Sequence, residues 1–156
     1  MIRDAKPDDA VAIAAIWNPV IRDTGITFTA VEKTADSLRD LIATRPVLVV
    51  ERVGALVGFA TYGPFRGGDG YRHTAEHTIH LHPDARGQGV GRILMDHLIV
   101  HARDAGIHTL WAGCSAENPG GVAFHQRLGF HQVAILPQVG RKFDRWMDLI
   151  LLTKVI

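Results

Sequence analysis

The segment of the sequence best suited to bind a charged ligand runs from Arg86 to Arg92. It reads Arg-Gly-Gln-Gly-Val-Gly-Arg and lies between a predicted strand and a predicted helix. Alternating glycines leave backbone N–H groups free to surround phosphate oxygens, and a helix that begins there adds about half a positive charge at its first residues. The segment therefore predicts a binding site for a pyrophosphate group.

Two well-known phosphate-binding patterns do not match this segment. The dinucleotide fingerprint spaces its glycines differently and needs an acidic residue about twenty positions further on. The strand predicted over His108–Cys114 ends without such a residue. A P-loop needs Lys followed by Ser or Thr after its last glycine, whereas Gly91 is followed by Arg92 and Ile93. What remains is a turn of the type Arg-x-x-Gly-x-Gly.

The histidines offer a weaker hypothesis, a metal site. His80 and His82 share one face of a predicted strand, but His77 points to the other face. His97 and His101 share a helix face but lack the Glu that follows the first His in the zinc-protease motif. We therefore expect no metal.

Covalent catalysis is also not favoured. Cys114 ends an apolar strand with no His or Asp beside it in the sequence to activate it, which favours a buried structural thiol. Ser37 and Ser115 are the only serines, and neither lies in a nucleophile-elbow motif. We therefore expect direct transfer chemistry without a covalent enzyme intermediate.

Composition limits the classes of protein that need to be considered. The 156 residues suit one domain, and 47% hydrophobic with 21% charged residues is ordinary for a globular fold. The net charge of +1, with no tract of one sign, argues against nucleic-acid or membrane partners. A single cysteine, no signal-peptide pattern at the amino terminus and no apolar run of about 20 residues lead us to expect a cytoplasmic protein.

Apolar periodicity and turn residues predict the elements that hold these residues. Helices are expected from about Asp8 to Asn18–Pro19, over Thr34–Ala43, from Val90 to Asp104, and over Asn118–Leu128. Strands are expected over Val47–Val53, Ala55–Tyr62, Thr74–Leu81, His108–Cys114, Phe130–Leu136 and Arg145–Leu152, with loops at Thr24–Thr29 and Gly63–Tyr71. This order predicts an α/β fold with a central mixed sheet and helices on both faces.

Three separated motifs carry a resemblance to a known family. They are Tyr71–His77, Arg86–Arg92 and Pro137–Leu149, and Asn118 with Phe124–Phe130 adds to them. With these motifs the chain resembles the GCN5-related N-acetyltransferase (GNAT) superfamily, in particular its phosphinothricin and methionine sulfone acetyltransferase branch. The resemblance runs essentially end to end and implies a single N-acetyltransferase domain over residues 1–156 with a GNAT acyl-CoA N-acyltransferase fold.

The resemblance implies acetyl-CoA as co-substrate and no metal. The residues that it implies for cofactor binding are Ile79, His80 and Leu81 on a strand, Arg86, Gly87, Gln88, Gly89, Val90, Gly91 and Arg92 in the turn, and Asn118 at a helix start. For Asn118 a plain helix N-cap is an equal alternative. His80, where related sequences usually have Tyr, and Gly121, where they usually have Ser, depart from the family pattern.

Glu76 is the candidate base, because an amine attacks a thioester only when neutral. Glu76 lies in a mostly apolar strand, and related enzymes carry Glu at this place. A surface carboxylate paired with Arg72 or Arg86 is the alternative. His125 takes the place of a Tyr that many superfamily members have, which implies a proton donor or a cofactor-facing residue, with helix packing as the alternative.

For the acceptor the resemblance implies Asp69, Gly70, Tyr71 and Arg72, and more loosely Phe28. An arginine can hold an amino-acid carboxylate through two parallel hydrogen bonds. The expected function is therefore acetylation of the α-amine of a small amino-acid-like molecule in a ternary complex. Alternatives are a protein N-terminal or polyamine acetyltransferase and a non-catalytic acyl-CoA sensor. A homodimer through Trp146 and the strand Asp148–Ile156 is expected, although a core strand would look the same.

Overall fold

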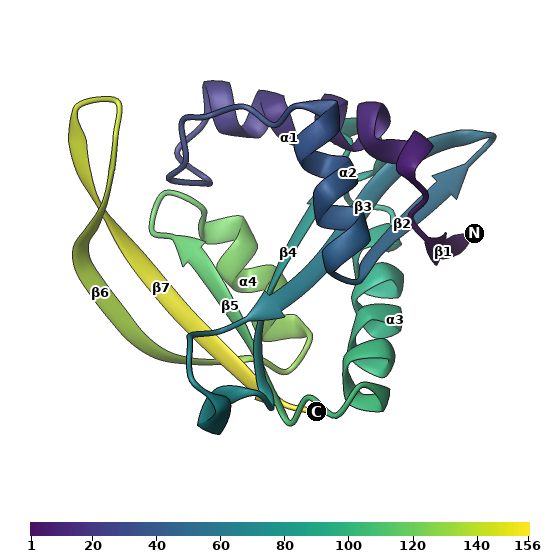
Figure 1. Ribbon diagram of the computed structural model, residues 1–156. Coiled ribbons are helices and arrows are strands. Elements are labelled where there is room, and N and C mark those ends of the chain that lie inside the picture. Colours follow the sequence, from purple (N-terminus) through teal and green to yellow (C-terminus); the bar gives the residue numbers. More distant parts are fainter.

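The computed structural model describes residues 1–156 as one mixed sheet with helices on both faces (Figure 1). The strands are β1 (Ile2–Asp4), β2 (Val47–Arg52), β3 (Ala55–Pro64), β4 (Thr74–Leu81), β5 (Thr109–Ser115), β6 (His131–Lys142) and β7 (Arg145–Val155). The α-helices are α1 (Ala10–Asp23), α2 (Ala35–Thr44), α3 (Val90–Asp104) and α4 (Pro119–Arg127), with 3-10 turns at Pro7–Asp9, Asp69–Tyr71 and Pro83–Ala85. The expected fold class is confirmed.

The strand order in the sheet is β1-β2-β3-β4-β5-β7-β6. Every neighbouring pair is antiparallel except β4 and β5, which run parallel and pair only from Thr74 with Thr109 to Glu76 with Trp111. Beyond Glu76, β4 keeps its pairing with β3 as far as Leu81, and β5 keeps its pairing with β7 as far as Ser115. The two halves of the sheet are therefore joined by three residue pairs and then part.

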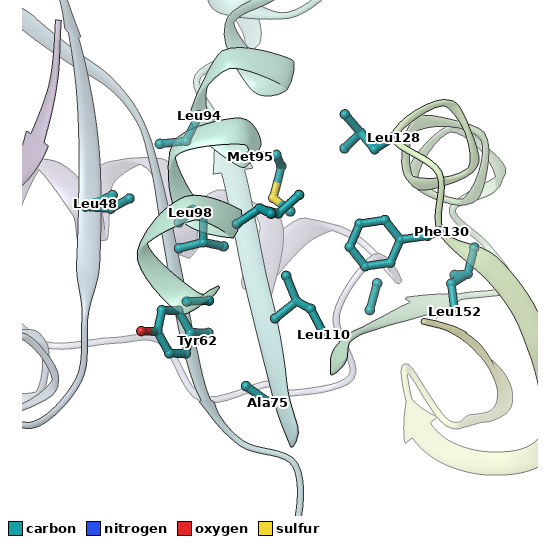
Figure 2. Close-up of a cluster of buried hydrophobic side chains, with 14 of the residues drawn as sticks. Leu48, Tyr62, Ala75, Leu94, Met95, Leu98, Leu110, Leu128, Phe130 and Leu152 are labelled. Carbon is teal, nitrogen blue, oxygen red and sulfur yellow. The ribbon is translucent and has the colours of Figure 1, made fainter. Parts of the chain in front are cut away.

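Alternate residues of β2 fill two separate apolar layers. Val47 and Val49 pack with Phe59 under α1 and α2. Leu48 and Val50 face the other side and join the larger cluster around α3. Figure 2 shows Leu94, Met95 and Leu98 of α3 in this cluster, with Leu48 and Leu110 on strands of the sheet. The predicted helical stripe of Val90, Leu94, Leu98 and Ala102 is buried along its whole length. Alternation in the strands therefore fixes which helices cover which face.

The hairpin of β2 and β3 turns at Val53 and Gly54, where the predicted strands Val47–Val53 and Ala55–Tyr62 meet. Val53 and Gly54 have φ values of 51° and 76°. Two positive φ values are what a two-residue type I′ turn requires. Gly54 adopts this conformation freely, whereas Val53 does so as a fully exposed β-branched residue.

The first helix differs from the prediction. It does not end at Asn18–Pro19 but continues through Pro19 to Asp23. Val20 and Ile21 are buried at 6% and 0% exposure, so packing on the sheet outweighs the hydrogen bond that proline removes. The Asn18 side chain is occupied elsewhere, because it donates to the carbonyl of Lys33 and accepts from its N–H.

The sheet has two further features that the sequence did not predict. Strand β1 is three residues long and pairs with β2. Strand β6 continues to Lys142 through a bulge at residues 137–139, so that β6 and β7 form a long twisted arm at the left of Figure 1. The C-terminal strand β7 lies between β5 and β6, which makes it an interior strand and leaves β6 at the edge.

Candidate active site

The parting of β4 from β5 opens a cavity of about 540 Å³. Residues from both strands, from the loop after α1 and from the starts of α3 and α4 line it. Of the residues predicted for the site, Phe28, Ile79, His80, Leu81, Arg86, Gly91, Asn118 and His125 face this cavity. The chain therefore gathers the strand, the turn and the later helix that the sequence singled out into one cleft.

The glycine turn Gly87–Gly91 lies at one end of this cleft and leads into α3. Gly87 and Gly89 have φ values of 71° and 79°, and a Cβ atom on either would meet nothing within 4 Å. Gly89 is the N-cap of α3 and has no side chain to cover the first N–H groups of the helix. These donors and the helix dipole therefore suit an anion such as a pyrophosphate.

The other residues of the turn contribute in different ways. The Arg86 guanidinium donates to the Leu81 carbonyl, which joins the turn to the end of β4. The Gln88 amide donates to the Asp84 carbonyl and accepts from Arg52. Val90 is buried in the core, so it can offer a ligand only its backbone. Arg92 does not line the cavity, although it lies in the first turn of α3.

Asn118 both caps α4 and faces the cavity. Its side-chain oxygen accepts from the Gly121 N–H at 3.0 Å. A Cβ atom on Gly121 would lie 2.3 Å from the Asn118 amide nitrogen, so the Asn118 side chain would have to shift if another residue stood there. The two interpretations of Asn118 are thus compatible, and Gly121 lets the Asn118 side chain lie close against the first turn of α4.

Glu76 marks the point at which the two strands part. A Cβ atom on Gly113 of β5 would lie 2.8 Å from a Glu76 carboxylate oxygen, so the carboxylate reaches across the gap to a cavity-lining residue. Glu76 is exposed at the surface, and partial desolvation by the strands around it raises its pKa. No arginine partner counters that shift, contrary to the surface ion-pair alternative.

His125 belongs to a buried imidazole pair. Its Nδ1 lies 2.7 Å from the Gly121 carbonyl, which can only accept, so Nδ1 carries the proton. Its Nε2 lies 2.9 Å from Nε2 of His77 and must therefore accept from it. Both ring nitrogens are engaged, and His125 has no N–H free to donate into the cavity. Of the two roles implied for His125, the arrangement suits the cofactor-facing one and opposes the proton donor.

Burial keeps the histidines of β4 neutral. Desolvation, and then His125, lowers the pKa of His77 to about 3. Nδ1 of His77 has no hydrogen-bond partner. The Trp111 backbone raises the pKa of His77, but by less than desolvation and His125 lower it. Desolvation, and then Arg86, lowers the pKa of His80 to about 4. The His80 ring packs on Trp17 and Phe59 and so forms part of the cavity wall.

The residues predicted to bind the acceptor do not all meet in one place. Tyr71 and Arg72 line a second cavity of about 440 Å³, whereas Phe28 lines the first. Asp69 and Gly70 lie in the adjoining 3-10 turn and line neither cavity. Arg45 and Arg66 also line the second cavity, and none of its lining residues is acidic.

Several residues of the main cleft were not predicted from the sequence. Trp17 and Phe124 line it from α1 and α4, and Cys114 and Ser115 line it from β5. The apolar pattern of α1 and α4 shows which residues are turned toward the sheet, but it does not show where the sheet parts. Cys114 is free and buried, and desolvation raises its thiol pKa to about 11, so it remains protonated.

No cluster of three His, Cys, Asp or Glu side chains that could hold a metal occurs in the structure. None of the helices has the length and apolar character needed to cross a bilayer.

The fold and the cleft together define the class of acyl-CoA-dependent N-acyltransferases. The family model described as acetyltransferase (GNAT) family matches residues 11–130. The chain therefore belongs to the GNAT acetyltransferase family and is an N-acetyltransferase.

Curated relatives place this chain more narrowly within the family. It is 41% identical to the L-amino acid N-acyltransferase MnaT of Escherichia coli, over 95% of this chain and 89% of the relative. It is 38% identical to the L-methionine sulfoximine/L-methionine sulfone acetyltransferase of Salmonella typhimurium, over 95% of this chain and 90% of the relative.

Solved structures agree in fold. A ribosomal-protein-alanine N-acetyltransferase from Brucella melitensis superposes with a TM-score of 0.96 at 37% identity, covering 100% of this chain and 99% of that one. The protein yncA from Salmonella typhimurium, solved with its cofactor acetyl-CoA, superposes with a TM-score of 0.94 at 36% identity, covering 99% of this chain and 92% of that one.

Proposed function

We propose that this enzyme transfers the acetyl group of acetyl-CoA directly to the α-amine of a small amino-acid-like acceptor of the methionine sulfone, methionine sulfoximine or phosphinothricin type. The observation that carries the proposal is the position of Glu76. Its carboxylate lies over Gly113 at the point where the strands part, and its pKa is raised. Glu76 does not itself line the main cavity, but its neighbours His77 and Gly113 do. A base of this kind can take a proton from an acceptor ammonium in a ternary complex.

The cleft has the features that acetyl-CoA would need. The open N–H groups at the start of α3 would hold its pyrophosphate, and the unpaired edge of β4 from Ile79 to Leu81 would bind its pantetheine amides. Bound acetyl-CoA supplies an acetyl group activated as a thioester. Asn118 and the neutral ring of His125 would face the cofactor from α4.

The acceptor would lie between Phe28, which lines the main cavity, and Tyr71 and Arg72, which line the second cavity. Gly63 pairs with Glu76 and lines the second cavity, so the base lies between the two cavities. An acceptor carboxylate on Arg72 would then leave its amine directed toward Glu76. Comparison of Arg72→Gln with Phe28→Ala distinguishes the roles of these two residues. Arg72→Gln removes the carboxylate contact and should raise KM only for acceptors that carry a carboxylate.

The experiment that tests the proposal measures thiol release from acetyl-CoA by the wild type and Glu76→Gln. The acceptors are methionine sulfone, methionine sulfoximine, phosphinothricin, polyamines and short peptides. We expect turnover with the amino-acid analogues and a fall of about 100-fold or more in kcat for Glu76→Gln. Turnover of peptides or polyamines alone would favour a protein N-terminal or polyamine acetyltransferase. Tight acetyl-CoA binding without turnover would favour a sensor.

We further propose that the enzyme is a cytoplasmic homodimer. Cys114 is a free thiol, which suits a reducing compartment. The edge strand β6 exposes Val133, Ile135 and Val139, and Trp146 is 59% exposed on the neighbouring strand. The dimer surface would therefore lie on the edge strand β6 and on the exposed Trp146 of β7, not on the rest of β7, which is an interior strand. Light scattering of the wild type and of the double variant Ile135→Lys, Trp146→Glu tests this. We expect a dimer for the wild type and a monomer for the double variant, and a wild-type monomer would refute the proposal.

A further inference from the structure

Lys142 is a buried cation whose ammonium group binds backbone carbonyls of a loop and forms no ion pair with a carboxylate. It is the last residue of β6 and is 5% exposed. Its Nζ donates to the carbonyls of Thr24 at 2.6 Å and Thr27 at 2.8 Å. Burial of the ammonium lowers the pKa of Lys142, so this position is costly for a lysine and is held by these two hydrogen bonds.

A second contact joins the same loop to the same hairpin. A Cβ atom on Gly140 of β6 would lie 2.4 Å from the Phe28 ring, so the ring packs directly on the Gly140 backbone. Only glycine leaves room for the aromatic ring in this position. Because Phe28 follows Thr27, its position depends on the backbone that Lys142 holds.

A third contact comes from the chain between β5 and α4. Glu117 pairs with Arg145 of β7 at 2.6 Å. A Cβ atom on Gly25 would meet this carboxylate at 2.8 Å. The β6–β7 hairpin therefore touches the loop near Gly25, Thr27 and Phe28.

The side of this loop that faces away from the hairpin forms part of the cleft wall. Ile26, Thr27, Phe28 and Thr29 all line the main cavity. The segment has no regular secondary structure of its own. The cavity wall on this side is therefore positioned by contacts from the hairpin.

We propose that Lys142 and Gly140 are positioning residues that fix the Phe28 wall and thereby determine which acceptors fit. This inference rests on the proposed function, in which Phe28 contacts the acceptor. Neither residue need touch the substrate. Their effect is transmitted through two backbone carbonyls and one aromatic ring, so acceptor recognition should depend on them while the acetyl-CoA end of the cleft should not.

The test compares Lys142→Met with Lys142→Arg and Lys154→Met. Lys154 is the matched control, because its Nζ donates to the Leu128 carbonyl at 2.7 Å, away from the loop. We expect Lys142→Met to raise KM for the acceptor about tenfold and to speed hydrogen–deuterium exchange in residues 24–29. The Kd for acetyl-CoA should stay within about twofold, Lys142→Arg should recover part of the loss, and Lys154→Met should show neither change.

Gly140→Ala provides a second route in case Lys142→Met does not fold. The added methyl group would displace the Phe28 ring while both Lys142 hydrogen bonds remain available. Acceptor KM should rise in Gly140→Ala, and the same change should add little in a Phe28→Ala background, where the ring is already gone.

The inference is overturned if exchange in residues 24–29 and acceptor KM both stay at wild-type values in Lys142→Met and Gly140→Ala. It is also overturned if acetyl-CoA affinity falls as much as acceptor affinity. If the wild type turns over no acceptor, the proposed function fails, and the exchange measurement alone then decides whether Lys142 holds the loop.

Discussion

The carboxyl group of Glu76 predicts the acid side of the pH–rate profile. A base acts only when it has lost its proton, and desolvation raises the pKa of Glu76 above the ordinary value of 4.5. We therefore expect kcat to fall as the pH drops through that raised pKa, and the fall to begin above pH 4.5. Measurement of kcat from pH 4.5 to 9 checks this. An unchanged acid limb in Glu76→Gln would rule out Glu76 as its source.

The buried ring of His77 predicts a loss of stability in acid. Folding lowers its pKa from 6.5 to about 3. Between these two pH values the unfolded chain binds a proton at His77 and the folded chain does not. The free energy of unfolding should therefore decrease as the pH falls below about 6.5, by at most about 1.4 kcal/mol per pH unit. Urea denaturation at pH 7.5, 6.5 and 5.5 measures this, and His77→Phe should show a shallower decrease. Equal slopes in both proteins would contradict it.

Individual site residues were predictable where a local pattern specifies a role. The glycine turn, the Asn118 cap and the strand that carries Glu76 depend on neighbours in the sequence. The pairing of His77 with His125 does not, because it joins residues 48 positions apart, and alternation along the strand shows only that His77 faces away from His80. The contacts of Lys142 with Thr24 and Thr27 span 118 and 115 positions and leave no local signal.

At the scale of elements, the two glycines that flank α3 should differ in their effect on acetyl-CoA binding. Gly89 precedes α3 with a φ of 79°, and Gly106 follows it with a φ of 91°. Alanine at either position should cost about 1 kcal/mol of stability, because left-handed backbone is unfavourable for residues with a Cβ atom.

Only Gly89→Ala should also weaken acetyl-CoA binding, since only that end of α3 faces the cleft. Thermal unfolding and calorimetric titration of both variants with acetyl-CoA separate the two effects. Equal affinities in the two variants would mean that the turn does not hold the cofactor.

Element boundaries were predictable to the extent that local preferences decide them. Strand β4 lies at the predicted residues, Thr74–Leu81, because turn residues bound it on both sides. Helix α1 extends beyond Pro19 because Val20 and Ile21 are buried, and tertiary packing of this kind outweighs a local stop signal. Strand β1 is only three residues long and exists through its pairing with β2, so no periodicity could indicate it.

For the whole molecule, the larger apolar cluster should carry much of the stability. Leu94 is fully buried in it, whereas its neighbour Ile93 on the same helix is 53% exposed. Leu94→Ala should lower the free energy of unfolding by about 3 kcal/mol, through lost burial and the cavity left behind. Ile93→Ala should change it by less than about 1 kcal/mol. Urea denaturation of both variants measures the difference, and similar losses would show that the cluster is not the stabilising core.

The arrangement of the two cavities could not be predicted from the sequence. The mixed sheet was predictable because hairpins, parallel strands and helices each leave their own pattern. The separation of Tyr71 and Arg72 from Phe28 depends on how two loops lie on the finished sheet, and no pattern within either loop records it.

The interior position of β7 has a consequence for the order in which the chain can fold. Strand β5 shares only three residue pairs with β4, whereas it pairs with β7 along its whole length from Thr109 to Ser115. During synthesis β5 leaves the ribosome before its main partner, and 40 residues separate the end of β5 at Ser115 from the end of β7 at Val155. One wall of the cleft therefore forms only after the last strand has emerged, and until then the edge of β5 is open to chaperones or to pairing with other chains.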